Sequence, residues 1–194
     1  MARHEGSNTS LEPGAAVRDG TIGGTIGRTV ATAGDEPMEQ TIRPRKRIGL
    51  VAHDNKKPDL TEWARFNQRL LVAHDLVATG TTGTLLEEEL GVGIMKLQSG
   101  PLGGDQQLGA LIADGEIDIL VFFWDPLEPQ PHDPDVKALL RLAVVWNIPI
   151  ACNRASADFM ISSPLMTSDY ERQMPDYRTY IDRFEPGPDA PAGA

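Results

Sequence analysis

The stretch IDILVFFWDP, residues 117–126, decides the fold class of this chain. Between Asp118 and Asp125 it carries an unbroken run of hydrophobic residues, ILVFFW. Such a near-continuous apolar run is typical of a strand that is buried on both faces of a parallel sheet. Helices then cover the two faces, so the stretch favours an α/β protein.

The sequence on either side of this stretch alternates between strand and helix patterns. Strands are predicted at 47–54, from 75 to about 79, at about 94–98, at 117–126 and at 148–153. Helices are predicted at 61–74, 133–147 and 155–163. Two more are predicted between them, one that begins at about residue 84 and one that ends at about residue 114. The alternation predicts a three-layer α/β sandwich of the flavodoxin or Rossmann type, with a roughly five-stranded parallel sheet.

Two of these helices carry expectations for single residues. In the helix at 61–74, the apolar spacing predicts one buried face made of Trp63, Phe66, Leu70 and Leu71. At the start of the helix at 133–147, Asp133 suits the cap position and the proline after it suits the first turn.

The composition divides the 194 residues into one folded domain and two flanking segments. Residues 1–42 include GTIGGTIGRTVATAG and lack a sustained apolar period, so they are expected to be a disordered extension. The domain is expected at 43–184, and the Pro/Gly/Ala-rich residues 185–194 are expected to be a disordered tail. Met38 lies just before the folded pattern, which raises the hypothesis that it is the true initiator.

Charge and composition exclude several classes of protein. A net charge of −10 is unfavourable for nucleic-acid binding, and the basic run RPRKR at 43–47 is interpreted as a solvated flank. No stretch approaches the roughly 18 apolar residues that a membrane span needs. The single cysteine, Cys152, excludes a disulfide framework, and it is expected to be a small buried residue at a strand end. With no signal-peptide core at the N-terminus, the expected location is the cytoplasm.

Polar residues gather where the predicted strands end. Ligands of parallel sheets bind beyond the carboxyl ends of the strands, so this edge is the expected site. The residues that follow the strands are His53, Asp54 and Lys57; TGTTGT at 79–84; Ser99, Gly100 and Asp105; and Asp125, His132, Asp133 and Asp135.

The segment TGTTGT suits a phosphate. Its glycine Gly80 lets the backbone approach a ligand, while Thr79, Thr81 and Thr82 offer hydroxyl donors. The following helix adds free N–H groups and a positive dipole end. The alternative is a plain turn with a threonine cap. No acidic residue stands where a dinucleotide fold would bind a ribose, so NAD is not expected.

The two histidines, His53 and His132, stand beside carboxylates in the sequence. This arrangement favours a role in acid–base or electrophilic catalysis, although a structural role stays open. Lys57 could hold a phosphate or could be a solvated loop lysine. A metal site is the competitor, because these histidines with Asp54, Asp105 and Asp125 could form a mixed set of ligands. No metal-binding motif is present, so no metal is expected.

Asp105 has two competing interpretations, a helix N-cap and a catalytic base. Capping would lower its basicity, whereas the glycine-rich loop in front of it would let a substrate come close. If Asp105 is a base, its carboxylate should point into the pocket and not at the N–H groups of Gln107 or Leu108.

Five segments closely resemble the methylglyoxal synthase family, over roughly residues 43–183. They are LVAHD (50–54), ATGTTG (78–83), SGPLGGDQQLGALIADG (99–115), FFWDPLEPQPHDPDVKALLRLAVVWNIPIA (122–151) and PDYRTYIDR (175–183). The resemblance implies a methylglyoxal-synthase-like fold and conversion of dihydroxyacetone phosphate to methylglyoxal and inorganic phosphate, without metal or organic cofactor.

The resemblance also implies roles for single residues. Asp105 would be the base, and His132 would polarise the substrate carbonyl and relay protons. Substrate and phosphate would be bound by His53, Lys57, Thr79, Gly80, Thr81, Thr82, Ser99 and Gly100, with Asp54, Asp125 and Asp135 as supporting carboxylates. Arg183 aligns with the family's C-terminal arginine when one residue is skipped after Tyr180.

The resemblance further implies a homohexamer, with inorganic phosphate as product and allosteric inhibitor. Three other classes of function compete with it: a non-catalytic phosphate-sensing domain of the same fold, a metal-dependent phosphohydrolase or aldolase, and a structural interaction module. A sensing domain could lose Asp105 and His132, and the presence of both argues against it.

Overall fold

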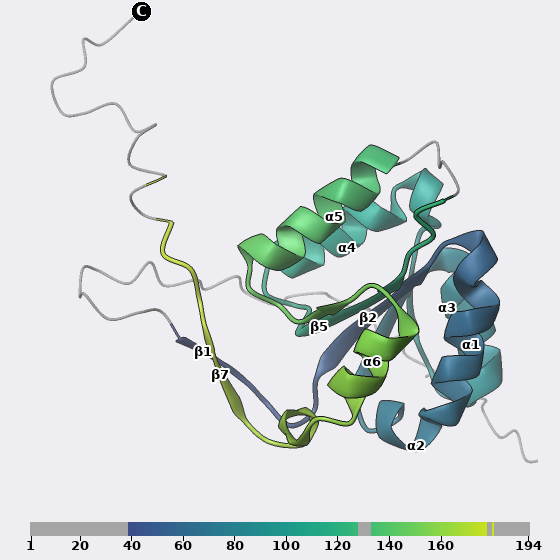
Figure 1. Ribbon diagram of the computed structural model, residues 1–194, viewed down its shortest axis with the longest axis horizontal. Helices are drawn as coiled ribbons and strands as arrows, with labels where there is room; N and C mark the ends of the chain where they lie inside the picture. The colour runs from purple at the N-terminus through teal and green to yellow at the C-terminus, as the bar shows by residue number, and fades with distance from the viewer. Residues whose placement is uncertain (1–38, 128–132, 178–179, 181–194) are drawn as a thin grey trace, which may run out of the picture. The chain divides into compact units, whose positions relative to one another are not determined.

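The computed structural model describes residues 39–127, 133–177 and 180, and its centre is a five-stranded parallel sheet (Figure 1). In sheet order the strands are β4 (Met95–Leu97), β3 (Asp75–Thr79), β2 (Arg47–Ala52), β5 (Ile119–Phe123) and β6 (Ile150–Ala151). Every neighbouring pair in this sheet is parallel. The predicted fold class and the approximate number of strands are therefore confirmed.

Helices cover both faces of the sheet (Figure 1). They are α1 (Lys57–Phe66), α2 (Gln68–Leu71), α3 (Gly80–Leu90), α4 (Gly104–Ala113), α5 (Asp133–Val145) and α6 (Arg154–Ile161). In β2, Leu50 joins the core under α1, α3 and α6, whereas Val51 joins the core under α4 and α5. All residues of β5 are buried, as the opening stretch predicted.

The order of the strands reverses between β2 and β5. Counted in chain order within this sheet, the strands run 3-2-1-4-5, with the first and fourth side by side. Ligands of such sheets bind at the carboxyl ends of the strands at this switch point. The backbone N–H of His53 donates to the carbonyl of Phe123 at 3.2 Å, which holds the two strand ends together.

The predicted buried face of the helix at 61–74 is wrong at Phe66 and Leu70. Phe66 is 83% exposed and Leu70 is 43% exposed, whereas Trp63 and Leu71 are buried as predicted. The buried stripe runs through Asn67, whose side-chain amide donates to the Trp63 carbonyl at 3.0 Å. Hydrophobicity alone assigned the stripe to phenylalanine, but a hydrogen-bonded asparagine occupies it.

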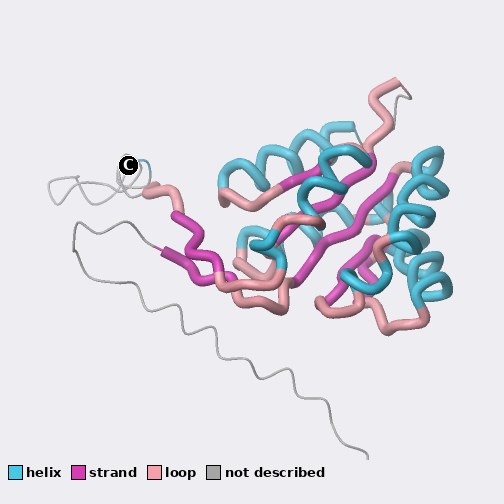
Figure 2. The backbone as a smooth tube through the Cα atoms, turned by 60° about the horizontal axis from the view of Figure 1, so that its bottom comes forward, coloured by secondary structure: helices cyan, strands magenta, loops and turns pink. Residues whose placement is uncertain are grey.

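A second sheet pairs β1 (Glu39–Ile42) antiparallel with β7 (Tyr170–Gln173), and Figure 2 shows these two strands apart from the five-stranded sheet. The boundary of the expected disordered extension at residue 42 is therefore wrong, because residues 39–42 form a strand. Within β1 only Ile42 is buried, and its partner strand lies far along the chain. So short a segment carries no sequence signal of its own.

Arg172 is a buried cation on β7 that is incompletely paired. Its side chain is 1% exposed, and one terminal amino group donates to the Gln40 side-chain carbonyl. In the part of the chain that the structure describes, Nε and Nη1 have no hydrogen-bond partner. Burial lowers the pKa of Arg172, which the negative charge of Asp118 partly offsets. Such a group costs folding free energy.

Arg172→Met is therefore expected to raise the free energy of unfolding by about 1–4 kcal/mol, because an apolar side chain of similar length removes the desolvation cost. Urea unfolding measures the change. Arg69→Met on α2 is the matched control at an exposed position, where little change is expected. A less stable Arg172→Met variant would show that the guanidinium stabilises the fold.

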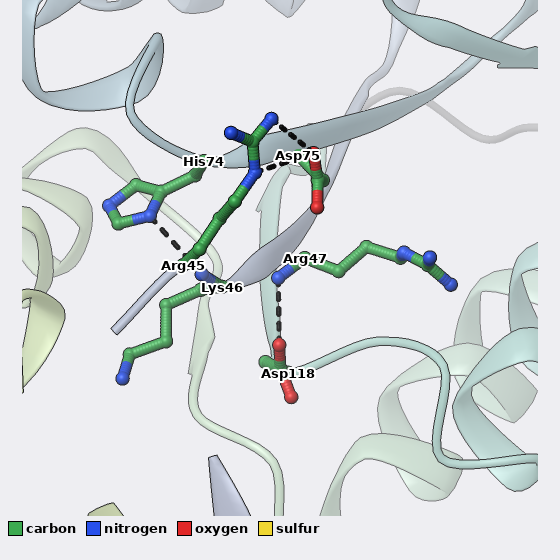
Figure 3. Close-up of polar contacts among 6 residues, drawn as sticks. All are labelled: Arg45, Lys46, Arg47, His74, Asp75 and Asp118. Atoms are coloured by element: carbon green, nitrogen blue, oxygen red, sulfur yellow. Dashed lines mark hydrogen bonds and ion pairs between the residues drawn. The ribbon is translucent and has the colours of Figure 1, made fainter. Parts of the chain in front are cut away.

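A polar network closes the other end of the sheet, where the strands begin (Figure 3). The Arg45 guanidinium donates to an Asp75 carboxylate oxygen at 2.6 and 2.9 Å, and the Arg47 backbone N–H donates to Asp118 at 2.7 Å. The Lys46 backbone N–H donates to Nδ1 of His74 at 3.3 Å. Lys46 is only 3% exposed, so the interpretation of residues 43–47 as a solvated flank is wrong there.

His74 is expected to make the fold sensitive to acid. Burial lowers its pKa, Lys46 and Arg45 lower it further, and Asp75 and Asp118 oppose them. The unfolded chain therefore takes up a proton below about pH 6.5 while the folded chain resists it, so stability falls as pH drops. One such proton changes the unfolding free energy by at most about 1.4 kcal/mol per pH unit.

Urea unfolding at pH 7.5 and 5.5 tests this, with His74→Gln as the comparison. Glutamine can still accept the Lys46 N–H but does not titrate. The wild type should lose more stability between these two pH values than His74→Gln does. Equal losses would show that other groups carry the acid sensitivity.

Candidate active site

A cavity of about 190 Å³ lies at the carboxyl ends of the strands, next to the switch point. It exceeds the roughly 10–15 Å³ that one water needs and is smaller than the roughly 300 Å³ at which drug-sized sites begin, so it suits a small metabolite. Its lining comprises Val51, Ala52, His53, Asp54, Lys57, Thr79, Thr81, Thr82, Ser99, Gly100, Pro101, Asp105 and Phe122. Most of the predicted site residues are thus brought together.

The threonine-rich segment is the first turn of α3. The helix was expected from about residue 84, but it begins at Gly80 with Thr79 as its N-cap. The Thr79 side chain makes no capping hydrogen bond, so a threonine cap does not explain the segment. The Thr82 hydroxyl is buried, and no hydrogen-bond partner for it is found among the residues described. The first N–H groups of a helix lack intrahelical acceptors, so this turn has free donors of the kind that suit an anion.

Asp105 lies on the first turn of α4 and is only 5% exposed. The N-cap residue of this helix is Gly103, which has a φ of +101° that favours glycine, and it makes no side-chain capping bond. The backbone N–H of Gln107 donates to the Gly103 carbonyl at 3.0 Å. The Asp105 carboxylate faces Gly100, where an added Cβ would be 3.0 Å from Oδ2. Asp105 is therefore not the N-cap residue, and its carboxylate is at the cavity.

The ring of His53 is held from both sides. Its Nδ1 accepts the backbone N–H of Asp125 at 3.3 Å, and its ring packs in a T-shaped arrangement with Phe122, the ring centroids 5.3 Å apart. A neutral imidazole that accepts on Nδ1 carries its hydrogen on Nε2. His53 therefore supplies a hydrogen-bond donor at the cavity, where it is one of the lining residues.

Lys57 is the first residue of α1 and brings a positive charge to the cavity. Its Nζ lies 2.5 Å from Oδ1 of Asp54, and the side chains are 18% and 87% exposed respectively. A solvated loop lysine would be far more exposed. The ion pair holds the ammonium group at the rim, where Coulomb attraction to an anion is screened less than in bulk water.

Asp125 contacts the site through its backbone N–H, which donates to the His53 ring. Its Oδ1 accepts the N–H of Leu127 at 3.0 Å, and this bond, helped by Asn55 and Lys56, lowers the pKa of Asp125. The carboxylate therefore stays ionised and fixes the turn whose N–H donates to His53.

Other predicted residues lie beside the cavity or outside the described chain. Gly80 packs under Ser99, and Asp135 lines a groove of about 330 Å³ between α4 and α5 that also touches Asp105. His132, Arg183 and Met38 fall outside the described residues.

Sequence reasoning missed the apolar walls and the residues that shape the loop. Pro101 and Phe122 line the cavity, and Phe122 could have been found from the alternation of faces within β5. The Gln98 backbone N–H donates to the side-chain carbonyl of Gln107, and no sequence motif predicts that contact.

The described ranges contain no group of three His, Cys, Asp or Glu residues arranged to hold a metal ion. Likewise, none of the described helices is long and apolar enough to cross a membrane. Cys152 follows β6, where burial raises the pKa of its thiol.

Comparisons with known proteins agree on one family. A model of the MGS-like domain matches residues 59–152. The chain is 64% identical over 137 residues to the methylglyoxal synthase of Saccharophagus degradans, covering 71% of this chain and 89% of that one. It is 59% identical over 152 residues to that of Cellvibrio japonicus, covering 78% and 99%. A crystal structure of methylglyoxal synthase from Elizabethkingia anophelis matches with a TM-score of 0.73 and 55% identity, covering 77% of this chain and 99% of that one.

Proposed function

Because the chain belongs to the methylglyoxal synthase family, we propose that the cavity converts dihydroxyacetone phosphate to methylglyoxal and inorganic phosphate, with Asp105 as the base. Methylglyoxal synthase activity, which is that of a phosphate-eliminating carbon–oxygen lyase, follows from the close similarity. The observation that carries the assignment of roles is the geometry of one cavity. A buried carboxylate lines the same cavity as a helix N-terminus that suits a phosphate.

The first chemical step is a proton transfer. The Asp105 carboxylate takes a proton from the hydroxymethyl carbon beside the ketone, and the C–H electron pair forms a carbon–carbon double bond. The carbonyl π electrons move onto oxygen and give an enediolate. Hydrogen-bond donors stabilise that charge. By the family resemblance His132 has this role, and the Nε2–H of His53 is a second donor at the cavity.

The second step releases phosphate. The hydroxyl on the former hydroxymethyl carbon passes its proton to the neighbouring enediolate oxygen, and its electron pair forms the aldehyde carbonyl. The carbon–carbon double bond shifts to the phosphate-bearing carbon, and the C–O bond to phosphate breaks with its electrons leaving on the phosphate. The enol that remains takes a proton at its CH₂ carbon, loses its hydroxyl proton and becomes methylglyoxal. The N-terminal turn of α3 with Thr79, Thr81 and Thr82, the charge of Lys57, and Ser99 with Gly100 receive the phosphate.

Elimination requires the C–O bond to lie out of the enediolate plane, so that it overlaps the π system. We assign that torsion to the groups that hold the phosphate, namely the α3 turn, Ser99 and Lys57. These groups and Asp105 line the same cavity, so the position in which they hold the phosphate sets the angle at which the substrate meets the base. Asp54, Asp125 and Asp135 support the site, Asp54 through its ion pair with Lys57.

Neither step transfers electrons to or from an acceptor, so no redox cofactor is needed, and by the family resemblance neither a metal nor an organic cofactor is proposed. Further proposals rest on the resemblance: a homo-oligomer of six chains, allosteric inhibition by inorganic phosphate, Arg183 near the phosphate, and a cytoplasmic location. A lone cysteine, which cannot build a disulfide framework, supports the last of these.

The test is to give the purified protein dihydroxyacetone phosphate and to follow methylglyoxal and phosphate together. Equal amounts of the two products are expected, and full activity should remain after exhaustive chelation. If no methylglyoxal forms, the proposed reaction is wrong. If activity disappears on chelation and returns with a metal, the metal-dependent alternative holds instead.

A further inference from the structure

The phosphate-binding turn and the base stand on different helices, α3 and α4. The segment between them leaves β4 through Gln98, passes Ser99, and forms the 3-10 helix η2 (Gly100–Leu102) before α4 begins. Ser99 and Gly100 line the cavity, so the placement of this segment decides how far the phosphate lies from the base.

A single residue of this segment, Gln98, is hydrogen-bonded through its backbone to both helices. The Gln98 carbonyl accepts the backbone N–H of Gly80 on α3 at 3.1 Å. The Gln98 N–H donates to Oε1 of the Gln107 side chain on α4 at 2.8 Å. The planar peptide bonds on either side of Gln98 leave few soft torsions between these two atoms. The two hydrogen bonds therefore join α3 and α4 through one residue.

Little free space surrounds this residue. A Cβ at Gly80 would lie 2.7 Å from the Ser99 hydroxyl oxygen, and a Cβ at Gly104 would lie 2.0 Å from the Gln98 carbonyl oxygen. A Cβ at Gly100 would lie 3.0 Å from the Asp105 carboxylate. Small rotations at Gln98 are therefore passed directly to Ser99 and Gly100, and so to their distance from Asp105.

We propose that Gln107 is a positioning residue for the reaction: its side-chain carbonyl holds the Ser99–Gly100 segment at the correct distance from the Asp105 carboxylate. The inference rests on the roles of Asp105, Ser99 and Gly100 given under the proposed function. Gln107 acts through the Gln98 backbone, so its effect is on geometry.

Because Gln98 makes two separate hydrogen bonds, loss of Gln107 is expected to change kcat much more than KM. Without Gln107, the bond to Gly80 still holds Ser99 and Gly100 against the α3 turn, so the phosphate contacts stay together. The Gly104 N–H of α4 still donates to the Ser99 carbonyl at 3.0 Å, but the bond that fixes Gln98 against α4 is lost, so the base is expected to be misplaced. Misplacement by about 1 Å can lower a rate by up to about a hundredfold. The Gln107 bond is exposed, so water can replace it at little cost to the fold.

The experiment compares Gln107→Leu, Gln107→Glu and Gln106→Leu in the full chain. Leucine removes the acceptor, whereas glutamate keeps an acceptor oxygen at a similar reach. Gln106 is the exposed neighbour on the same helix and serves as the matched control. With dihydroxyacetone phosphate we expect Gln107→Leu to lower kcat by about tenfold or more with KM changed less than about threefold. Gln107→Glu and Gln106→Leu should both stay within about threefold of wild type.

Melting temperatures separate positioning from damage to the fold, and the Gln107→Leu shift should not exceed about 4 °C. Equal kcat in Gln107→Leu and wild type would overturn the inference, as would equal losses in the leucine and glutamate variants. Asp105→Asn in the same assay separates the two proposals. If that variant is inactive while Gln107→Leu is normal, only the positioning role is wrong; if Asp105→Asn is fully active, the site assignment itself is wrong.

Discussion

Asp105→Asn is expected to lower kcat by about 10²–10⁴-fold, because the amide cannot take the proton from the carbon beside the ketone. Asparagine has nearly the same shape as aspartate, so the packing of the side chain against Gly100 should survive. The phosphate contacts come from other elements, so KM should change much less than kcat. Steady-state kinetics with dihydroxyacetone phosphate at neutral pH measure both constants.

Asp114→Asn is the matched control, since this exposed residue is the C-cap of the same helix and lies far from the cavity lining. It should keep wild-type kinetics. Thermal melting of Asp105→Asn checks that the fold is intact. A folded Asp105→Asn enzyme with kcat within about threefold of wild type would rule out Asp105 as the base, because loss of a general base costs more.

Much of the fold could be predicted because one rule dominates parallel sheets. A strand covered on both faces must be apolar along its length, and β5 has that pattern and is buried throughout. Phe66 shows where such reasoning fails, because the buried stripe continues past the end of α1 to Asn67, whose side-chain amide donates to the Trp63 carbonyl. β1 and β7 fail for another reason: each has only four residues, too few to carry a period, and each pairs with a strand far away in the sequence.

The candidate site could be predicted to a similar extent. Strand ends of a parallel sheet meet at one edge, so the sequence predicts that His53, Thr79 and Ser99 lie together, and they share a cavity. The contacts that set distances within the site could not be predicted from the hydrophobic pattern or from motifs. The bond from the Gln98 backbone to Gln107 depends on how α4 is placed against β4, and no residue type signals it.

The glycine at position 104 carries the second large effect. Its α-carbon lies so close to the preceding strand end that an added Cβ would be 2.0 Å from the Gln98 carbonyl oxygen and 2.8 Å from the carbonyl carbon. Both atoms belong to the backbone, and the oxygen is already bonded to the Gly80 N–H. Relief to an ordinary contact requires a movement of about 1 Å, because real Cβ contacts essentially never fall below 3.0 Å.

Gly104→Ala is therefore expected to lower the free energy of unfolding by about 1–3 kcal/mol through overpacking. It should also lower kcat by up to about a hundredfold, since the same movement separates Ser99 from the base. Gly93→Ala is the matched control, because a Cβ there meets nothing within 4 Å and its φ is not in the left-handed region. Urea unfolding and steady-state kinetics of the two variants decide the matter. If Gly104→Ala matched Gly93→Ala in both measurements, the close packing of α4 against Gln98 would not be what fixes the position of Asp105.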